Sequence, residues 1–232
     1  MRIVMLADLH GNLPATLAME AALKPLHPDE IWFLGDAVGK GPSNAETCDW
    51  ARAHCTLCLG GNWDYGIGGK EFEGDHYFWN QLGEERMRWL NGLPREADRY
   101  ISGVRFRLFH GRPVTELMAV QDDKDKLSAA FQAHGVTYGG VIFADIHRPF
   151  FRTLNVGYII NTGSVGNSMG VPRAHALMVD GELDSREPAP LITSILSIPY
   201  DNEAAADIAR GDEHLPHREA YINEVLTGVY SR

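Results

Sequence analysis

Aspartate, histidine and asparagine residues recur in this sequence directly after short apolar runs, and they carry the donor atoms that divalent cations prefer. The seven that follow predicted strand ends are Asp8, His10, Asp36, Asn62, His110, Asp145 and His147. A mixture of carboxylate, imidazole and amide donors suits Mn²⁺, Fe²⁺ or Zn²⁺, and one carboxylate can bridge two ions. Each motif alone is more typical of a turn, but their joint occurrence predicts a site for two divalent cations.

These side chains can meet only if the elements before them end at one edge of the fold. In the first half of the chain, apolar runs at 1–8, 29–36 and 55–62 predict strands, and residues 14–26 and 44–54 predict helices, the first capped by Asn12. This alternation is typical of layered α/β folds, whose ligands bind beyond the carboxyl ends of the strands. If the chain stays extended after residue 143, Asp145 and His147 also point to the same side.

The second half is richer in strands. Predicted strands at 98–103, 104–111, 140–145, 150–156, 157–163 and 175–181 are divided mostly by glycine or proline, and the tail from Leu191 predicts one more strand and a terminal helix. A second sheet packed on the first is therefore expected. The Gly-rich and aromatic stretch at 64–95 is expected to form a helical excursion, and residues 1–232 are expected to form a single domain.

Composition limits the classes of function. The chain has 21 basic and 31 acidic residues, a formal charge of −10, which disfavours a surface that binds nucleic acid through its phosphates. The first apolar run, at 3–7, is too short for a signal peptide or a membrane span, so a cytoplasmic protein without membrane contact is expected. If residues 55–59 form a strand, Cys55 and Cys58 face opposite sides and cannot share a metal; with Cys48, they are expected to be small buried apolar residues.

Six segments of the chain occur in a specific order. They are DLHGN (8–12), GDAVGKGPSNAE (35–46), GGNWD (60–64), FHGRP (109–113), ADIHRP (144–149) and NTGSVGNS (161–168). Together they resemble the calcineurin-like metallophosphoesterases, in particular the small bacterial and archaeal phosphoesterases and phosphodiesterases. The resemblance implies an α/β fold in which two mixed β-sheets pack as a sandwich and are flanked by helices.

The same resemblance, position by position, implies roles for individual residues. One ion would be held by Asp8, His10, Asp36 and His147, and the second by Asp36, Asn62, His110 and Asp145, with Asp36 as the bridge. Asp36, Asn62 and Asp64 would serve catalysis, Asp64 by supporting the ligands together with Gly163 and Ser164. The implied cofactor is two divalent metal ions, with Mn²⁺ favoured and Fe, Mg²⁺, Zn²⁺ or Ni²⁺ as alternatives.

Two positions depart from the family pattern. Asp145 stands where the family usually has a histidine, so the centre gains a negative charge, attracts phosphate less strongly and favours harder ions such as Mn²⁺. Trp63 stands where the family usually has a histidine that protonates the leaving oxygen, and an indole cannot transfer that proton. His76 and His175 are candidates to approach the site in its place. The other histidines are expected at the surface: His27, His54, His134, His214 and His217.

The leading hypothesis is that the protein hydrolyses a small phosphodiester or nucleotide-like phosphoester, by in-line attack of a hydroxide that the two cations generate. Arg112 and Arg148, each beside a proposed ligand, are candidates to clamp the phosphate. The alternative is a catalytically impaired metal-binding module that acts through a ligand or a protein partner, and Asp145 and Trp63 favour it. The negative charge disfavours a nucleic acid substrate, and the oligomeric state stays open.

Overall fold

The first three strands of the chain and two strands from its last third form one five-stranded sheet. The computed structural model describes residues 1–71 and 75–231, and in it β1 (Arg2–Leu6), β2 (Glu30–Phe33) and β3 (Leu57–Cys58) are parallel. β11 (Ala174–Asp180) pairs antiparallel with β1, and β12 (Ile192–Ile198) with β11, so the strand order is β12-β11-β1-β2-β3. Because β1, β2 and β3 are parallel, the loops that follow them lie at one edge of the sheet.

A second five-stranded sheet is built from the middle of the chain. Its strands, in spatial order, are β4 (Glu96–Ile101), β5 (Val104–Phe109), β8 (Gly140–Phe143), β10 (Gly157–Asn161) and β9 (Phe150–Leu154). β5, β8 and β10 are parallel, whereas the two edge strands are antiparallel to their neighbours. Both sheets are therefore mixed, and the loops after β5 and β8 also share an edge.

The two sheets pack face to face, and the residues of β1 show how. Ile3 and Met5 lie in an apolar cluster with Ile142 of the second sheet, whereas Val4 and Leu6 lie in the cluster that includes the helices of the first sheet's outer face. Successive side chains of a strand point to opposite faces, and both faces of β1 are buried. This double burial explains the unbroken apolar run at 3–7.

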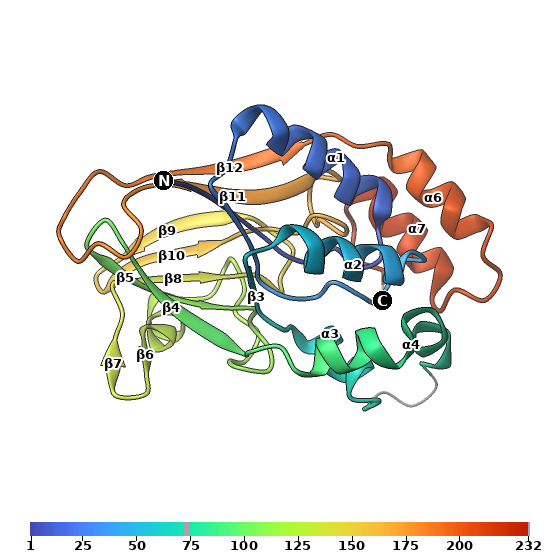
Figure 1. The fold of residues 1–232 in the computed structure, drawn as a ribbon, viewed down its shortest axis with the longest axis horizontal. Helices are drawn as coiled ribbons and strands as arrows, with labels where there is room; N and C mark the ends of the chain where they lie inside the picture. Colours follow the sequence, from blue (N-terminus) through green and yellow to red (C-terminus); the bar gives the residue numbers. More distant parts are fainter. Residues whose placement is uncertain (72–74, 232) are drawn as a thin grey trace.

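Helices cover the outer face of the first sheet (Figure 1). Two helices, α1 (Leu13–Leu23) and α2 (Asn44–His54), contribute side chains to the apolar cluster that contains Val4 and Leu6 of β1. The short η1 (Lys24–Leu26) follows α1 and packs against the same cluster. α3 (Asn62–Gly68) packs on α4 (His76–Asn91), and α4 also contacts α2. The start of α3 directly follows β3, so it lies at the edge where the strand ends meet.

The carboxyl-terminal helices form a separate pair. α6 (Asn202–Arg210) packs on α7 (Arg218–Thr227) at the right-hand end of the molecule in Figure 1, and α6 also contacts α1. The remaining elements are short: α5 (Lys124–Ser128), η2 (Ala129–Phe131), β6 (Gln132–Ala133) and β7 (Val136–Thr137). They connect β5 to β8, and β6 and β7 form a two-stranded sheet of their own.

The fold class predicted from the sequence is confirmed, because two mixed sheets pack together and are flanked by helices. α2 has the predicted bounds, and the Asn12 side chain caps α1 by accepting a hydrogen bond from the Ala15 amide. The predicted excursion at 64–95 contains α3 and α4, with residues 72–74 outside the described part. In the described part of the chain, no helix has the length and apolar character that crossing a membrane requires.

Some local expectations are wrong. The tail after β12 forms two helices and not one, and the elements between residues 124 and 137 escape sequence patterns because each has only two to five residues. β3 spans only Leu57–Cys58, so Cys55 precedes the strand, and the thiols of Cys55 and Cys58 interact with each other instead of facing opposite sides. Cys48 is fully buried, as expected, whereas the other two cysteines are partly exposed.

Candidate metal centre

Loops after the strand ends bring most of the predicted ligands together. Asp8 and His10 follow β1, and His147 follows β8 in the second sheet. Asp8 Oδ1 lies 3.6 Å from His10 Nε2 and 3.4 Å from His147 Nε2, and the two imidazole nitrogens lie 3.2 Å apart. These three buried side chains form the first group that can hold a cation.

A second group shares Asp8 with the first. His110 Nε2 lies 3.7 Å from Asp8 Oδ1 and 3.2 Å from Asp36 Oδ2, and all three side chains are buried. Asp36 Oδ2 also lies 3.7 Å from His10 Nε2, which belongs to the first group. Either carboxylate can therefore reach both groups, and the assignment of Asp36 as the bridge stays a prediction.

Backbone carbonyls orient all three histidines. The Nδ1 atoms of His10, His110 and His147 lie 3.0, 2.8 and 2.6 Å from the carbonyl oxygens of Val38, Leu34 and Asn167, respectively. A carbonyl oxygen only accepts, so Nδ1 carries a proton in each of these histidines, and Nε2 is the ring atom that can bind a cation. Histidine ligands of metals are usually oriented in this way. The Nε2 atoms of His10 and His147 lie 3.2 Å apart and both face the same point, so one cation could bind both of them.

Four buried polar atoms of the centre have no hydrogen-bond partner among the described residues. They are both carboxylate oxygens of Asp8, Asn62 Oδ1 and His110 Nε2. Leaving such an atom unsatisfied typically costs about 1–3 kcal/mol. Because all four are oxygen or nitrogen donors of the kind that divalent cations bind, bound metal would satisfy them. The donor set therefore fits the cofactor that the sequence predicts.

The carboxylates dominate the electrostatics of the second group. Burial by itself lowers the pKa of His110, but the charges of Asp36 and Asp8 raise it well above its ordinary value. In the first group, burial and then the Lys40 ammonium hold the pKa of His10 well below its ordinary value. The half of the centre that contains Asp36 and His110 therefore strongly favours an added positive charge.

The backbone at the site is strained. Five of the candidate ligands have positive φ angles, at 55° for Asp8, 45° for His10, 60° for Asp36, 69° for Asp145 and 57° for His147. Left-handed backbone is unfavourable for residues with a Cβ atom and typically costs about 1–3 kcal/mol per residue. The chain is thus not extended at Asp145 and His147, and the alternation argument for their shared direction is wrong.

The sequence matches the model of one protein family. The model of the calcineurin-like phosphoesterases matches residues 1–163, more than half of the chain, and this range includes every candidate ligand. The chain belongs to this family. The family uses divalent metals, in agreement with the two groups of ligands described above.

Three relatives show how far the likeness extends. A metallophosphoesterase from Sphaerobacter thermophilus is 24% identical with a TM-score of 0.77, and a hypothetical protein from Pyrococcus horikoshii OT3 is 20% identical with a TM-score of 0.79; in both cases 99% of each chain is covered. An uncharacterized protein from Methanocaldococcus jannaschii is 28% identical over 204 residues, 77% of this chain and 82% of its own. The two solved structures show that the whole chain shares the fold, including the part beyond residue 163.

Asp64 is hydrogen-bonded to the backbone of two loops that carry candidate ligands. Its Oδ2 accepts hydrogen bonds from the amides of Asp36, at 2.7 Å, and Gly61, at 3.0 Å, and its Oδ1 accepts one from Ala37 at 2.9 Å. Burial, and then the Asp36 carboxylate, raises the pKa of Asp64 to about 7. Both oxygens thus fix the two loops that carry Asp36 and Asn62, which agrees with the supporting role predicted for Asp64.

Asp145 lies apart from both groups of ligands and is bound by an arginine. Arg112 donates from Nη2 to Asp145 Oδ1 at 2.6 Å, from Nε to Oδ2 at 2.9 Å and from its amide to Oδ2 at 3.0 Å. Burial would raise the pKa of Asp145, but the guanidinium holds it below its ordinary value. The charge of the extra carboxylate is therefore compensated by Arg112, which also lies in the wall of the pocket described below.

A pocket of about 710 Å³ opens over the centre. Its wall contains the candidate ligands Asp36, Asn62, Asp145 and His147 and the cationic side chains of Lys40, Arg112 and Arg148. The rest of the wall is largely apolar and includes Trp63, Phe78, Leu117, Val120, Met169 and Tyr230. Sequence patterns missed this apolar wall because its residues come from loops and helices scattered over the whole chain.

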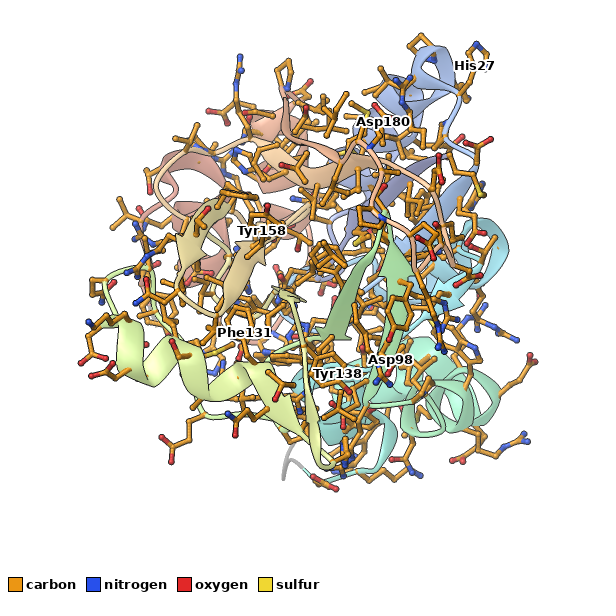
Figure 2. The ribbon with its side chains drawn as sticks, turned by 90° about the vertical axis from the view of Figure 1, so that its left-hand side faces the viewer. His27, Asp98, Phe131, Tyr138, Tyr158 and Asp180 are labelled. Atoms are coloured by element: carbon orange, nitrogen blue, oxygen red, sulfur yellow. The ribbon has the colours of Figure 1, made fainter. Side chains whose placement is uncertain are left out.

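The histidines proposed as substitutes for a general acid do not line the described pocket. His175 is buried and hydrogen-bonded at both nitrogens, to Ser168 Oγ at 2.8 Å and Ser197 Oγ at 3.2 Å, and His76 is exposed with its ring against Trp79. The five histidines expected at the surface are exposed; His27, for example, lies at the outer margin of the molecule in Figure 2. One of the five, His217, also lines the pocket.

Replacing Arg112 tests the part that Asp145 plays. In Arg112→Met the carboxylate is released toward the second group, so we expect the second Mn²⁺ ion to bind more tightly by about 10-fold or more, the size of effect that partners of metal ligands typically have. Calorimetric titration of the metal-free protein with Mn²⁺ measures this affinity. Arg148→Met, the other arginine of the pocket, is the matched control and should leave it unchanged. If Arg112→Met and Asp145→Ala both bind Mn²⁺ like the wild type, Asp145 is not a ligand.

Proposed function

We propose that the protein hydrolyses a small phosphodiester or nucleotide-like phosphoester with the help of two divalent cations. The observation that carries the proposal is that the two buried ligand groups open onto a pocket with cationic and apolar walls. Pockets of about 300–1,000 Å³ are typical for small ligands, and the volume here, about 710 Å³, lies within that range. The apolar wall suits an aromatic or nucleoside-like group on the phosphoester.

The residues of the chain would divide the work as follows. Asp8, His10, Asp36, His110 and His147 would hold the cations, with Asn62 Oδ1 as a further ligand. Bound cations would supply a nucleophilic hydroxide at neutral pH and would stabilise the negative charge on the phosphoryl oxygens. A donor set that mixes two carboxylates and an amide oxygen with three imidazoles suits Mn²⁺, Fe²⁺ or Zn²⁺, and among these we favour Mn²⁺.

The formal charge of −10 supports a small substrate in preference to a polynucleotide. In an assay of the purified protein with Mn²⁺, we expect the fastest hydrolysis with a nitrophenyl phosphodiester, slower hydrolysis with the corresponding monoester and none with single-stranded DNA. Elemental analysis after incubation with Mn²⁺ should find two ions per chain, and chelation should remove the activity.

Each outcome of this experiment has a meaning for the proposal. A chain that stays empty at millimolar Mn²⁺ would contradict the metal centre itself. A chain that binds two ions but hydrolyses none of the three substrates would support the alternative, a metal-binding module that acts through a ligand or partner.

A further inference from the structure

The apolar wall of the pocket has a buried part and an exposed part. Phe78 and Met169 are buried, with 2% and 8% of their surface exposed. Leu117, Val120 and Tyr230 line the same pocket but are 46%, 36% and 60% exposed. Apolar side chains that stay in contact with water forgo the stabilisation that burial gives. Several of them together in the wall of one small-molecule pocket are typical of a surface that a ligand covers.

The loop that carries Leu117 and Val120 is held in place through its backbone. Lys126 Nζ donates to the carbonyl oxygen of Leu117 at 2.9 Å, and Arg152 Nη1 donates to that of Asp122 at 2.8 Å. Lys126 Nζ also lies 2.8 Å from the Asp122 carboxylate. The two exposed side chains are therefore presented by a loop with a fixed backbone, and such preorganisation reduces the entropy that binding a ligand must overcome.

The segment that carries Tyr230 is tied to α7 on both sides of this residue. The Val229 amide donates to Thr227 Oγ1 at 3.1 Å, and Ser231 Oγ donates to the carbonyl oxygen of Ala220 at 3.1 Å. A tyrosine side chain has only two main torsions, so little further freedom is lost when its ring binds a ligand. The segment thus holds a largely exposed aromatic ring in the wall of the pocket.

Two polar side chains in the same wall favour one kind of ligand. Asp75 and His217 are the N-cap residues of α4 and α7, but neither side chain caps its helix, and both line the pocket. Burial raises the pKa of Asp75 and the charge of His217 lowers it, so the two groups lie near each other. A hydrocarbon chain would cover these polar groups without hydrogen bonds, which is unfavourable, whereas a nucleoside has hydroxyl groups that can pair with them.

We propose that Tyr230 is a specificity-determining residue that stacks on the nucleobase of a nucleoside phosphoester, with Leu117 and Val120 packed against the same base. The inference rests on the proposed function, which places the phosphoryl group at the cations, and it names the nucleoside as the other part of the substrate. Asp75 and His217 bind sugar hydroxyls in this arrangement. A base offers a flat π face to the tyrosine ring, and stacking of this kind tolerates different bases.

Two ligands that differ in the base test the role of Tyr230. They are the phosphonate analogues of adenosine 5′-monophosphate and of ribose 5-phosphate, in which a methylene group replaces the ester oxygen so that neither is hydrolysed. By calorimetry, the Mn²⁺-loaded wild type should bind the adenosine analogue more tightly by about 5- to 150-fold, the usual effect of stacking one base on an aromatic side chain.

In Tyr230→Ala this preference should disappear, while the affinity for the ribose analogue and the metal content stay at the wild-type values. Tyr230→Phe keeps the ring and should keep the preference. Val229→Ala is the matched control, because Val229 is the neighbouring residue, is also 60% exposed and does not line the described pocket. Leu117→Ala should reduce the preference, but less than Tyr230→Ala, because the ring of Tyr230 still covers one face of the base.

The possible outcomes separate this inference from the proposed function. The inference is wrong if the wild type binds both analogues equally, if Tyr230→Ala keeps the preference, or if Tyr230→Ala weakens both analogues alike. Hexylphosphonate that binds as tightly as the adenosine analogue would identify an alkyl chain as the occupant and also reject it. If Tyr230→Ala does not fold, Leu117→Ala decides, and an unchanged preference in it rejects the inference. A preference that depends on Tyr230 in a protein that hydrolyses no ester would reject only the proposed function.

Discussion

Asp36→Asn is expected to abolish hydrolysis of a nitrophenyl phosphodiester, with kcat/KM in Mn²⁺ lowered by roughly 10³-fold or more. Asp36 Oδ2 lies within 3.7 Å of histidine nitrogens from both ligand groups, so one substitution weakens two cation sites. Even the loss of an outer partner of a metal ligand typically costs about 10- to 100-fold. Kinetics at saturating Mn²⁺ and elemental analysis of the same sample measure the two effects together.

The fold should survive this substitution. Asp36 Oδ1 accepts a hydrogen bond from the Trp63 amide at 2.9 Å, and the side-chain oxygen of asparagine can accept the same bond. The Asp36 carboxylate repels that of Asp64 but attracts His110, so the two effects oppose each other and the melting temperature of the metal-free protein should change little. Asp207→Asn on the exposed surface of α6 is the control. Near-normal activity of Asp36→Asn at full Mn²⁺ occupancy would show that the two-cation assignment is wrong.

The sequence predicted those parts of the fold and site that depend on local patterns. Unbroken apolar runs predicted β1 and β2, because strands buried on both faces need no polar alternation. The Asn12 cap predicted the start of α1. The strands that precede the candidate ligands are parallel within each sheet, so the residues that follow them lie at one edge of the fold. This rule allowed the sequence to predict which side chains meet: Asp8, His10, Asp36, His110 and His147.

The rest of the site depends on contacts between distant segments, which no local pattern encodes. Asp145 has a left-handed backbone conformation, which the apolar run before it does not predict. Its carboxylate is bound by Arg112 from another loop, so the residue type alone wrongly suggested an uncompensated charge. Lys40 and Glu224 are 184 positions apart in the chain, yet they meet beside Asn167. Asn167 lies in the segment NTGSVGNS that the sequence singled out, but its partners could not be named from the sequence.

Trp63 is the second position from which we expect a large effect, because it decides how the leaving group departs. Its ring lies edge-to-face against His10, with centroids 5.8 Å apart, and against Phe78, with centroids 6.4 Å apart. The ring also packs so closely on Gly39 that a Cβ atom there would lie 2.3 Å from it. The indole thus occupies the position beside the centre where the family pattern has a histidine, and unlike a histidine it cannot donate a proton to an alkoxide.

The rate of hydrolysis should therefore depend steeply on the leaving group. Nitrophenolate departs without a proton and an alkoxide does not, and a positioned general acid typically contributes about 10²–10⁴-fold. We expect measurable hydrolysis of nitrophenyl diesters, much slower hydrolysis of alkyl esters, and a gain of about 10²-fold or more for alkyl esters alone in Trp63→His. Trp63→Phe, which also empties space over Gly39 but adds no acid, is the control that separates chemistry from pocket size. If the wild type hydrolyses both kinds of ester at similar rates with chemistry limiting, another acid is present, and His217 in the pocket wall is the first to replace.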